Sequence, residues 1–137
     1  MNVLIVEGDQ FLRNYLRLQV AEAAWCDGVD VVEAATLDDA LAILSAGQMD
    51  AELSDEAFPP GWGEAMNDLS RWAEGWRTLH RECKRLGIPF VLLSGDPAIV
   101  AAARSLGVAA LSKPCETRAA IDRLLTLAAA HLVANAR

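Results

Sequence analysis

The sequence predicts a doubly wound α/β fold built around one parallel sheet of five strands. Five short apolar runs alternate along the chain with five segments whose apolar residues recur every three or four positions, as in a helix that covers a sheet. Parallel strands joined by helices need right-handed crossovers, which place helices on the faces of the sheet. With 137 residues, 53% of them apolar, the chain can form one domain with a sizeable core.

The order of the elements follows from these runs. Strands are expected at residues 3–6, 29–34, 51–55, 89–94 and 108–112. Helices are expected at residues 10–25, 37–44, 63–87, 97–106 and 116–134. Asp9 and Thr36 precede the first two helices and are suited to cap them. The third helix is predicted to be extended, because apolar residues from Met66 to Leu86 step by three or four without a gap.

Charge and composition disfavour several classes of protein. The 12 basic residues are outnumbered by 19 acidic ones, and the resulting net charge of −7 disfavours nucleic-acid binding. Cys26, Cys83 and Cys115 are widely spaced and indicate neither a disulfide framework nor a zinc site, which fits a reducing cytoplasm. The chain shows no secretory signal and no apolar stretch long enough to span a bilayer. We expect a single domain over residues 1–137 without an output domain.

Polar residues gather at the ends of the predicted strands, where a sheet of this kind binds its ligands. They are Glu7, Asp9, Asp55, Ser94 and Lys113. Clustered carboxylates attract Mg²⁺, and a metal together with a lysine neutralises the negative charge around an aspartate that attacks a phosphoryl group. The edge therefore predicts a phosphoryl-transfer site, with Ser94 donating a hydrogen bond to a phosphoryl oxygen. Asp9 is equally suited to cap the following helix, so its role stays open.

Four stretches in this order resemble the receiver domain of bacterial two-component response regulators, which has a flavodoxin-like fold. They are VLIVEGD from Val3, DEAFP from Asp55, FVLLSGDP from Phe90 and LSKP from Leu111. The resemblance implies that Asp55 accepts the phosphoryl group and that Ser94 and Lys113 bind it. It also implies a cis Lys113–Pro114 bond and the metal ligands Glu7, Asp9, Asp55 and Ala57.

The same resemblance implies a cytoplasmic signalling domain rather than an enzyme, with at most slow self-dephosphorylation. The expected partners are a histidine kinase or phosphotransfer protein and a downstream protein target, with no nucleic acid and no membrane. A second copy of the chain is a further candidate partner, because residues 127–133 are apolar on more than one side of the last helix. Flavin-binding flavodoxins share the fold, but residues 7–9 present carboxylates where their phosphate site needs amide donors.

Two departures from the receiver pattern keep a second hypothesis open. Receivers have two adjacent acidic residues after the first strand, where this chain has Glu7 and Gly8. They usually have an aromatic residue three positions before the lysine, where this chain has Ala110. The chain is therefore either a stand-alone phosphoacceptor, with doubtful magnesium binding, or a degenerate receiver that binds other proteins without being phosphorylated.

Several side chains outside the predicted site also have alternative interpretations. Glu52 falls on a face of its strand that should be apolar, so either its carboxylate is buried with a partner or the covering helix is displaced. Trp72 and Trp76 are expected in the core, but those of Trp62, Trp72 and Trp76 that extend beyond the sheet are candidates for an exposed partner surface. His131 has no predicted partner and is expected at the surface or the edge of the core.

Overall fold

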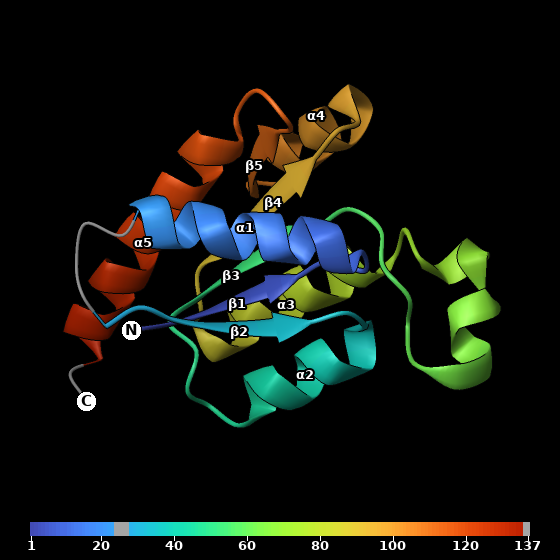
Figure 1. Cartoon of the computed structure of the whole chain (residues 1–137), viewed down its shortest axis with the longest axis horizontal. Coiled ribbons are helices and arrows are strands. Elements are labelled where there is room, and N and C mark those ends of the chain that lie inside the picture. The colour runs from blue at the N-terminus through green and yellow to red at the C-terminus, as the bar shows by residue number, and fades with distance from the viewer. Residues whose placement is uncertain (24–27, 136–137) are drawn as a thin grey trace.

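The structure is a computed structural model that describes residues 1–23 and 28–135, and it contains one five-stranded parallel sheet (Figure 1). The strands are β1 (Asn2–Val6), β2 (Asp30–Ala34), β3 (Ala51–Asp55), β4 (Phe90–Ser94) and β5 (Ala109–Ser112). Their spatial order is β2-β1-β3-β4-β5, and every neighbouring pair is parallel. The predicted doubly wound, flavodoxin-like fold is confirmed.

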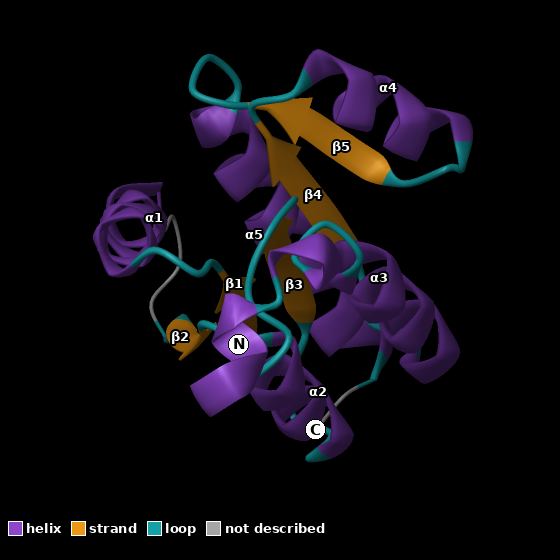
Figure 2. Ribbon diagram, turned by 90° about the vertical axis from the view of Figure 1, so that its right-hand side faces the viewer, coloured by secondary structure: helices purple, strands orange, loops and turns teal. Residues whose placement is uncertain are grey.

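Helices cover both faces of the sheet (Figure 2). One face packs against α1 (Gln10–Ala23) and α5 (Thr117–Ala134), and the other against α2 (Leu37–Ser45), α3 (Gly75–Leu86) and α4 (Pro97–Ser105). Along β1, Val3 and Ile5 face the first pair of helices while Leu4 and Val6 face the other three. All four side chains are fully buried, which explains why β1 is a continuous apolar run.

Local signals set most helix boundaries close to their predicted positions. Thr36 Oγ1 accepts a hydrogen bond from the Asp39 amide and caps α2, as predicted. Gly87, with φ of 73°, ends α3 in the left-handed conformation that glycine adopts without strain. The predicted end of the first helix at residues 24–25, and Cys26, lie outside the described residues. In the part of the chain that is described, no helix is long and apolar enough to cross a membrane.

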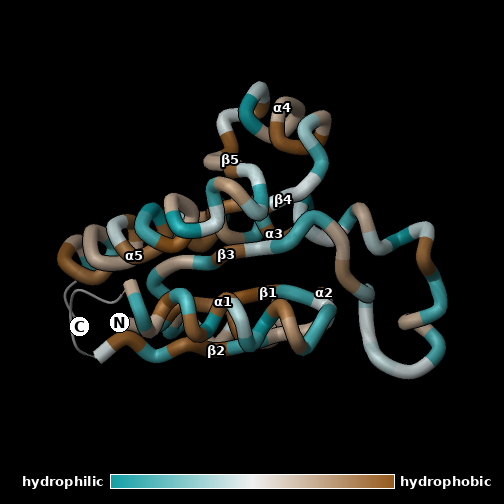
Figure 3. The backbone as a smooth tube through the Cα atoms, turned by 45° about the horizontal axis from the view of Figure 1, so that its top comes forward, coloured by the Kyte–Doolittle hydropathy of each residue, from teal (hydrophilic) through white to brown (hydrophobic). Residues whose placement is uncertain are grey.

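The prediction of one long helix over residues 63–87 is wrong. The structure forms two short 3-10 helices, η1 (Gly63–Asn67) and η2 (Leu69–Arg71), and the α-helix begins only at Gly75. We call residues 57–74 the arm, since part of this segment projects beyond the carboxyl edge of the sheet (Figure 1). In Figure 3 the arm mixes hydrophilic and hydrophobic residues, whereas β1 is mostly hydrophobic. The apolar spacing therefore starts before the point where the chain meets the sheet, and Leu69, which lies in that earlier part, is 69% exposed.

Phe58 explains where the arm ends. Its side chain is fully buried, and its backbone amide donates to the Trp72 carbonyl at 3.2 Å. A Cβ on Gly75 would lie 2.5 Å from Phe58 Cε2, so the absence of a side chain there makes room for the ring. Trp72 and Gly75 thus contact Phe58 where the arm ends and α3 begins. Of the tryptophans, Trp76 is buried as predicted, whereas Trp72 is only partly buried and lies outside the helix.

Glu52 is buried and has a partner, which was the first of its two alternatives. Its side chain is fully buried between β3 and α3, and Cys83 Sγ lies 2.7 Å from Glu52 Oε2. Glu52 Oε1 makes no hydrogen bond among the described atoms. Burial raises the pKa of Glu52 to about 7, partly offset by the Cys83 hydrogen bond. The helix that covers this carboxylate is therefore in place.

His131 has a partner that the sequence did not indicate. Its Nδ1 lies 3.1 Å from Oδ1 of Asp50, a fully buried residue just before β3. Asp50 Oδ2 also accepts a hydrogen bond from the Asn2 amide at 2.9 Å. These contacts join the last turns of α5 to the starts of β1 and β3, at the edge of the sheet opposite the predicted site. His131 thus lies at the edge of the core, as predicted, but in a specific polar contact.

Candidate functional site

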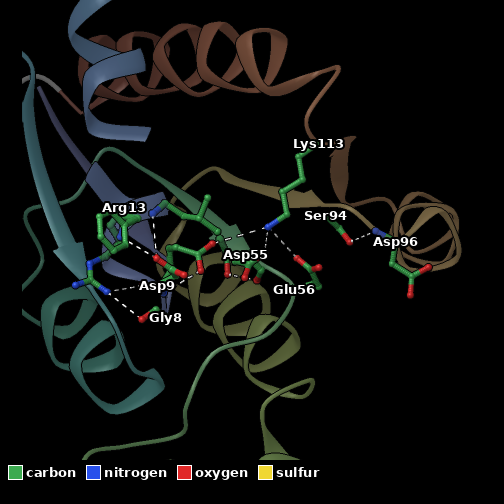
Figure 4. Close-up of polar contacts among 12 residues, drawn as sticks. Gly8, Asp9, Arg13, Asp55, Glu56, Ser94, Asp96 and Lys113 are labelled. Atoms are coloured by element: carbon green, nitrogen blue, oxygen red, sulfur yellow. Dashed lines mark hydrogen bonds and ion pairs between the residues drawn. The ribbon is translucent and has the colours of Figure 1, made fainter. Parts of the chain in front are cut away.

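The carboxyl edge of the sheet brings three carboxylates around one ammonium group (Figure 4). Lys113 Nζ lies 2.5 Å from Asp55 Oδ1, 3.4 Å from Glu56 Oε2 and 3.9 Å from Glu7 Oε2. Glu7 follows β1, Asp55 and Glu56 stand at the end of β3, and Lys113 follows β5. We call these four residues the Lys113 cluster. Its residues come from three strands, so it exists only in the folded chain.

Glu7 is the most enclosed member of the cluster. Its side chain is 5% exposed, and its Oε1 accepts a hydrogen bond from the Asp9 amide at 3.1 Å. Burial raises the pKa of Glu7, while the Asp9 amide and the charge of Lys113 oppose that rise. The carboxylate predicted from its position after a buried strand therefore does point into the cluster.

Glu56 is a cluster residue that the sequence analysis missed. Its Oε2 is buried and forms no hydrogen bond among the described atoms, although Lys113 Nζ lies 3.4 Å away. Burial, followed by the neighbouring Asp55 carboxylate, raises the pKa of Glu56 to about 7. Its place directly after Asp55 was the only signal, and a residue following a strand end points to solvent as often as inward.

Lys113 balances part of this negative charge. Burial on its own would lower the pKa of Lys113, but the carboxylates of Asp55, Glu56 and Glu7 outweigh burial and raise it. The Lys113 amide donates to the Ser94 carbonyl at 2.9 Å, which holds the start of the loop against β4. The Lys113–Pro114 peptide bond is cis, as the resemblance implied.

Ser94 lies at the end of the strand next to Asp55, and its side chain is turned towards α4. Its Oγ accepts a hydrogen bond from the Asp96 amide at 3.0 Å, and Asp96 in turn caps α4 through the Ala98 amide. Among the described residues we find no hydrogen bond from the Ser94 hydroxyl to the side chain of Asp55 or Lys113. The structure thus places Ser94 beside the Lys113 cluster without joining it to the cluster.

The predicted magnesium ligands do not come together as one set. Asp9 Oδ1 accepts hydrogen bonds from the Phe11 and Leu12 amides, at 2.8 and 3.3 Å, and so caps α1. Ala57 offers only its backbone carbonyl, and within residues 1–23 and 28–135 no three His, Cys, Asp or Glu side chains are arranged to hold a metal ion. The side chains alone do not form a magnesium site as arranged here, and magnesium binding stays a prediction.

Gly8, where receivers usually have an acidic residue, is packed against the arm. A Cβ at this position would lie 3.1 Å from Pro59 Cδ and 3.7 Å from the Phe58 backbone. The space that a longer side chain would enter is therefore narrowed by the arm. Gly8 and the arm are therefore two parts of one local arrangement.

Ala110 is held by a side chain from α4. Arg104 Nε donates to the Ala110 carbonyl at 2.8 Å, and the Arg104 guanidinium lies 3.5 Å from Glu116 Oε1. The same Glu116 oxygen accepts a hydrogen bond from the Ser112 amide at 2.8 Å. Two outward-facing backbone groups of the edge strand β5 are therefore paired with side chains.

An apolar cavity of about 210 Å³ adjoins the cluster. It lies between α1 and the start of α5, and the apolar residues on its walls are Leu12, Tyr15, Leu16, Leu53, Leu93 and Pro114. Glu7, Asp55 and Lys113 also line this cavity. The cluster is thus screened on one side by apolar side chains, which strengthens electrostatic interactions within it.

The chain has the fold of response-regulator receiver domains. The receiver domain of Francisella response regulator 1452 is 18% identical to this chain, with a TM-score of 0.68, and the match covers 94% of this chain and 97% of that one. A response regulator receiver protein from Sinorhizobium medicae is 20% identical, with a TM-score of 0.69, and the match covers 96% of each chain.

A de novo designed Rossmann 2x3 fold protein is similar to nearly the same degree. It is 16% identical, with a TM-score of 0.66, and the match covers 91% of this chain and 89% of the designed one. No protein-family profile and no curated protein matches the sequence. Because a designed protein shares the architecture, the likeness shows the fold, and function has to be argued from the Lys113 cluster.

Proposed function

We propose that this chain is a receiver-type signalling domain that accepts a phosphoryl group on Asp55 from the phosphohistidine of a kinase or phosphotransfer protein. The contact of 2.5 Å between Lys113 Nζ and Asp55 Oδ1 carries this proposal. It places a fixed positive charge on the candidate acceptor at the carboxyl edge of the sheet. The Asp55 and Lys113 side chains keep 10% and 27% of their exposure, so a donor can approach them.

The transfer uses groups that this chain supplies. A carboxylate oxygen of Asp55 forms a bond to phosphorus while the P–N bond of the phosphohistidine breaks, and the electron pair of that bond stays on the imidazole nitrogen. Lys113 then passes from the Asp55 carboxylate to the negative phosphoryl oxygens. The Ser94 hydroxyl proton is available to a phosphoryl oxygen, because Oγ acts here as the acceptor for the Asp96 amide. The product signals through contact with another protein.

Incubation with acetyl phosphate and Mg²⁺, followed by intact mass spectrometry, tests the proposal. We expect the chain to gain the mass of one phosphoryl group. Asp55→Asn should gain none, whereas Asp68→Asn, a matched change at an exposed aspartate on the arm, should behave like the unmodified chain. Equal labelling of the Asp55 and Asp68 variants would contradict the assignment of the acceptor.

A second candidate function is a degenerate receiver that binds proteins without being phosphorylated. Two observations favour it: the arm packs on Gly8, and the cluster has three carboxylates for one ammonium group. A dianionic phosphoryl group would add to that negative charge. An unmodified mass after long incubation with the donor, in a chain that remains folded by circular dichroism, would favour this candidate over the phosphoacceptor.

A further inference from the structure

We propose that Glu56 responds to the charge added when Asp55 is phosphorylated. Its movement displaces the arm and the start of α2. This inference rests on the proposed phosphorylation of Asp55 and goes beyond it, because it names the part of the surface that changes. It is carried by three features of the structure: the shared lysine, the anchored arm and the fixed opposite side of the site.

The shared lysine couples the two neighbouring carboxylates. Lys113 Nζ contacts Asp55 at 2.5 Å and Glu56 at 3.4 Å. Within the described residues, Lys113 is the only cation paired with either carboxylate. When a phosphoryl group draws Lys113 away, Glu56 loses its counter-charge and faces added negative charge at close range. An ionised Glu56 is then repelled, and its buried Oε2 has no hydrogen bond to hold it in place.

The contacts of the arm determine which part of the protein a movement of Glu56 displaces. Two residues after Glu56, Phe58 is fixed in the core, and Pro59 lies so close to Gly8 that a Cβ there would be 3.1 Å from Pro59 Cδ. The carbonyl groups of Pro59 and Pro60 accept hydrogen bonds from the Leu37 and Asp38 amides, at 2.9 and 3.0 Å. Consecutive prolines have restricted φ angles, so this segment transmits a shift instead of absorbing it.

The arm is tied to α2 a second time. Trp62 Nε1 donates to Asp39 Oδ2 at 2.7 Å, and 59% of the Trp62 side chain is exposed. The first turn of α2 therefore holds the arm through two backbone bonds and one side-chain bond. A displacement of the arm changes the surface around Trp62 and loosens the start of α2.

The opposite side of the site lacks a comparable path. Ala110 carries only a methyl group, and its carbonyl is held by Arg104 at 2.8 Å. Glu116 holds the Ser112 amide at 2.8 Å. The Ser94 hydroxyl is occupied by the Asp96 amide, just before α4 begins at Pro97. We therefore place the response at the arm and α2 instead of at β5 and α4.

Hydrogen exchange measured by mass spectrometry before and after incubation with acetyl phosphate and Mg²⁺ tests this inference. Intact mass on the same samples reports whether Asp55 is phosphorylated. We expect faster exchange in peptides covering residues 36–40 and 56–74, with no change in residues 98–112. Glu56→Gln should still gain the phosphoryl mass but lose the change in exchange. Glu64→Gln, a matched change on the exposed part of the arm, should keep it.

Each outcome bears on one of the two proposals. A mass gain without faster exchange in residues 36–40 and 56–74, or with the change located in residues 98–112, overturns the inference and leaves the phosphoacceptor proposal standing. Retention of the change in Glu56→Gln also overturns the role of Glu56. A folded chain that gains no mass overturns both proposals.

Discussion

Two regions on the same strand handle buried carboxylates in different ways. Asp55, at the end of β3, shares Lys113 with Glu56 and Glu7 at the carboxyl edge of the sheet. Glu52, three residues earlier on β3, lies in the core against the Cys83 thiol, and no ion pair to it is seen in the described part of the chain. Burial raises the pKa of Glu52 to about 7, so a proton neutralises it over much of the acid range.

The two carboxylates differ in what can change their charge state: Asp55 can exchange its lysine partner, whereas Glu52 can only gain or lose a proton. A carboxylate neutralised by a lysine can change its partner when a phosphoryl group arrives, because the lysine side chain moves. A carboxylate neutralised by a proton responds only to pH, and its desolvation lowers the stability of the fold once the proton leaves. The four predictions below change one region at a time, and the largest expected effect comes first.

Lys113→Met should have the largest effect, because it removes the single cation of the edge cluster while keeping a side chain of similar length. We expect phosphorylation of Asp55 by acetyl phosphate to slow by about 100-fold or more, the size of effect seen when a charge-stabilising group is lost. The rate is measured by intact mass over time. Lys84→Met, on an exposed position of α3, is the control and should leave the rate unchanged.

Glu52→Gln should remove a large part of the pH dependence of stability. The folded-state pKa of Glu52, about 7, lies above the unfolded value of 4.5, so the folded chain binds more protons between these values and its stability falls as pH rises. The stabilising contribution is complete below pH 4.5 and is lost as pH rises through about 7. The expected loss from Glu52 alone is about 3 kcal/mol.

Urea unfolding between pH 5 and 8 measures this loss. Glu52→Gln should have a clearly smaller slope over that range, and the slope that remains comes from Glu7 and from Glu56, whose pKa is also raised to about 7. Glu64→Gln should keep the full slope, since this exposed residue lies on the arm. A parallel pH dependence in the Glu52 and Glu64 variants would show that Glu52 is not the titrating group.

The edge cluster was largely predictable from the sequence, and the interior was not. Strand ends can be found from apolar runs, and in a parallel sheet their side chains meet at one edge, so Glu7, Asp55 and Lys113 were placed together. Glu56 was missed because the pattern gives no direction for a residue just beyond a strand. The partner of Glu52 depends on which turn of α3 faces β3, a matter of packing that no spacing rule supplies.

The arm was mispredicted for a similar reason. A helical period in residues 66–86 indicates an amphipathic face, but it says nothing about whether a surface lies beneath that face. The sheet supplies one from Trp76 onwards, and before that point Phe58 occupies the space in front of Gly75. The contact between Pro59 and Gly8 likewise joins two loops that are far apart in the sequence.

Cys83→Ala should lower stability by about 2 kcal/mol at pH 8, where Glu52 is ionised and the thiol is its hydrogen-bond donor. The effect should be smaller at pH 5, where Glu52 carries its own proton. Urea unfolding at both pH values measures the difference. In the Glu52→Gln background the pH dependence of the Cys83 effect should disappear, and Cys115→Ala, at an exposed thiol, should change stability little at either pH.

Gly8→Asp should have the smallest effect and tests whether the edge can be returned to a metal site. The new carboxylate joins three others and its Cβ meets Pro59 Cδ at 3.1 Å, so we expect a loss of about 1 kcal/mol in metal-free buffer. Millimolar Mg²⁺ should recover the lost stability, because a ligand that binds only the folded state stabilises that state. Thermal unfolding with and without Mg²⁺ measures both steps.

Gly8→Asn separates steric crowding at Gly8 from the added charge, since it makes the same contact with Pro59 without a negative charge. It should lose a similar steric amount but gain nothing from Mg²⁺. If Mg²⁺ stabilised the unmodified chain as much as Gly8→Asp, the three carboxylates already present would be sufficient to bind the cation, and the packing of Pro59 on Gly8 would have no bearing on metal binding. A response confined to Gly8→Asp would instead show that the native edge needs a further carboxylate at this position to bind the cation.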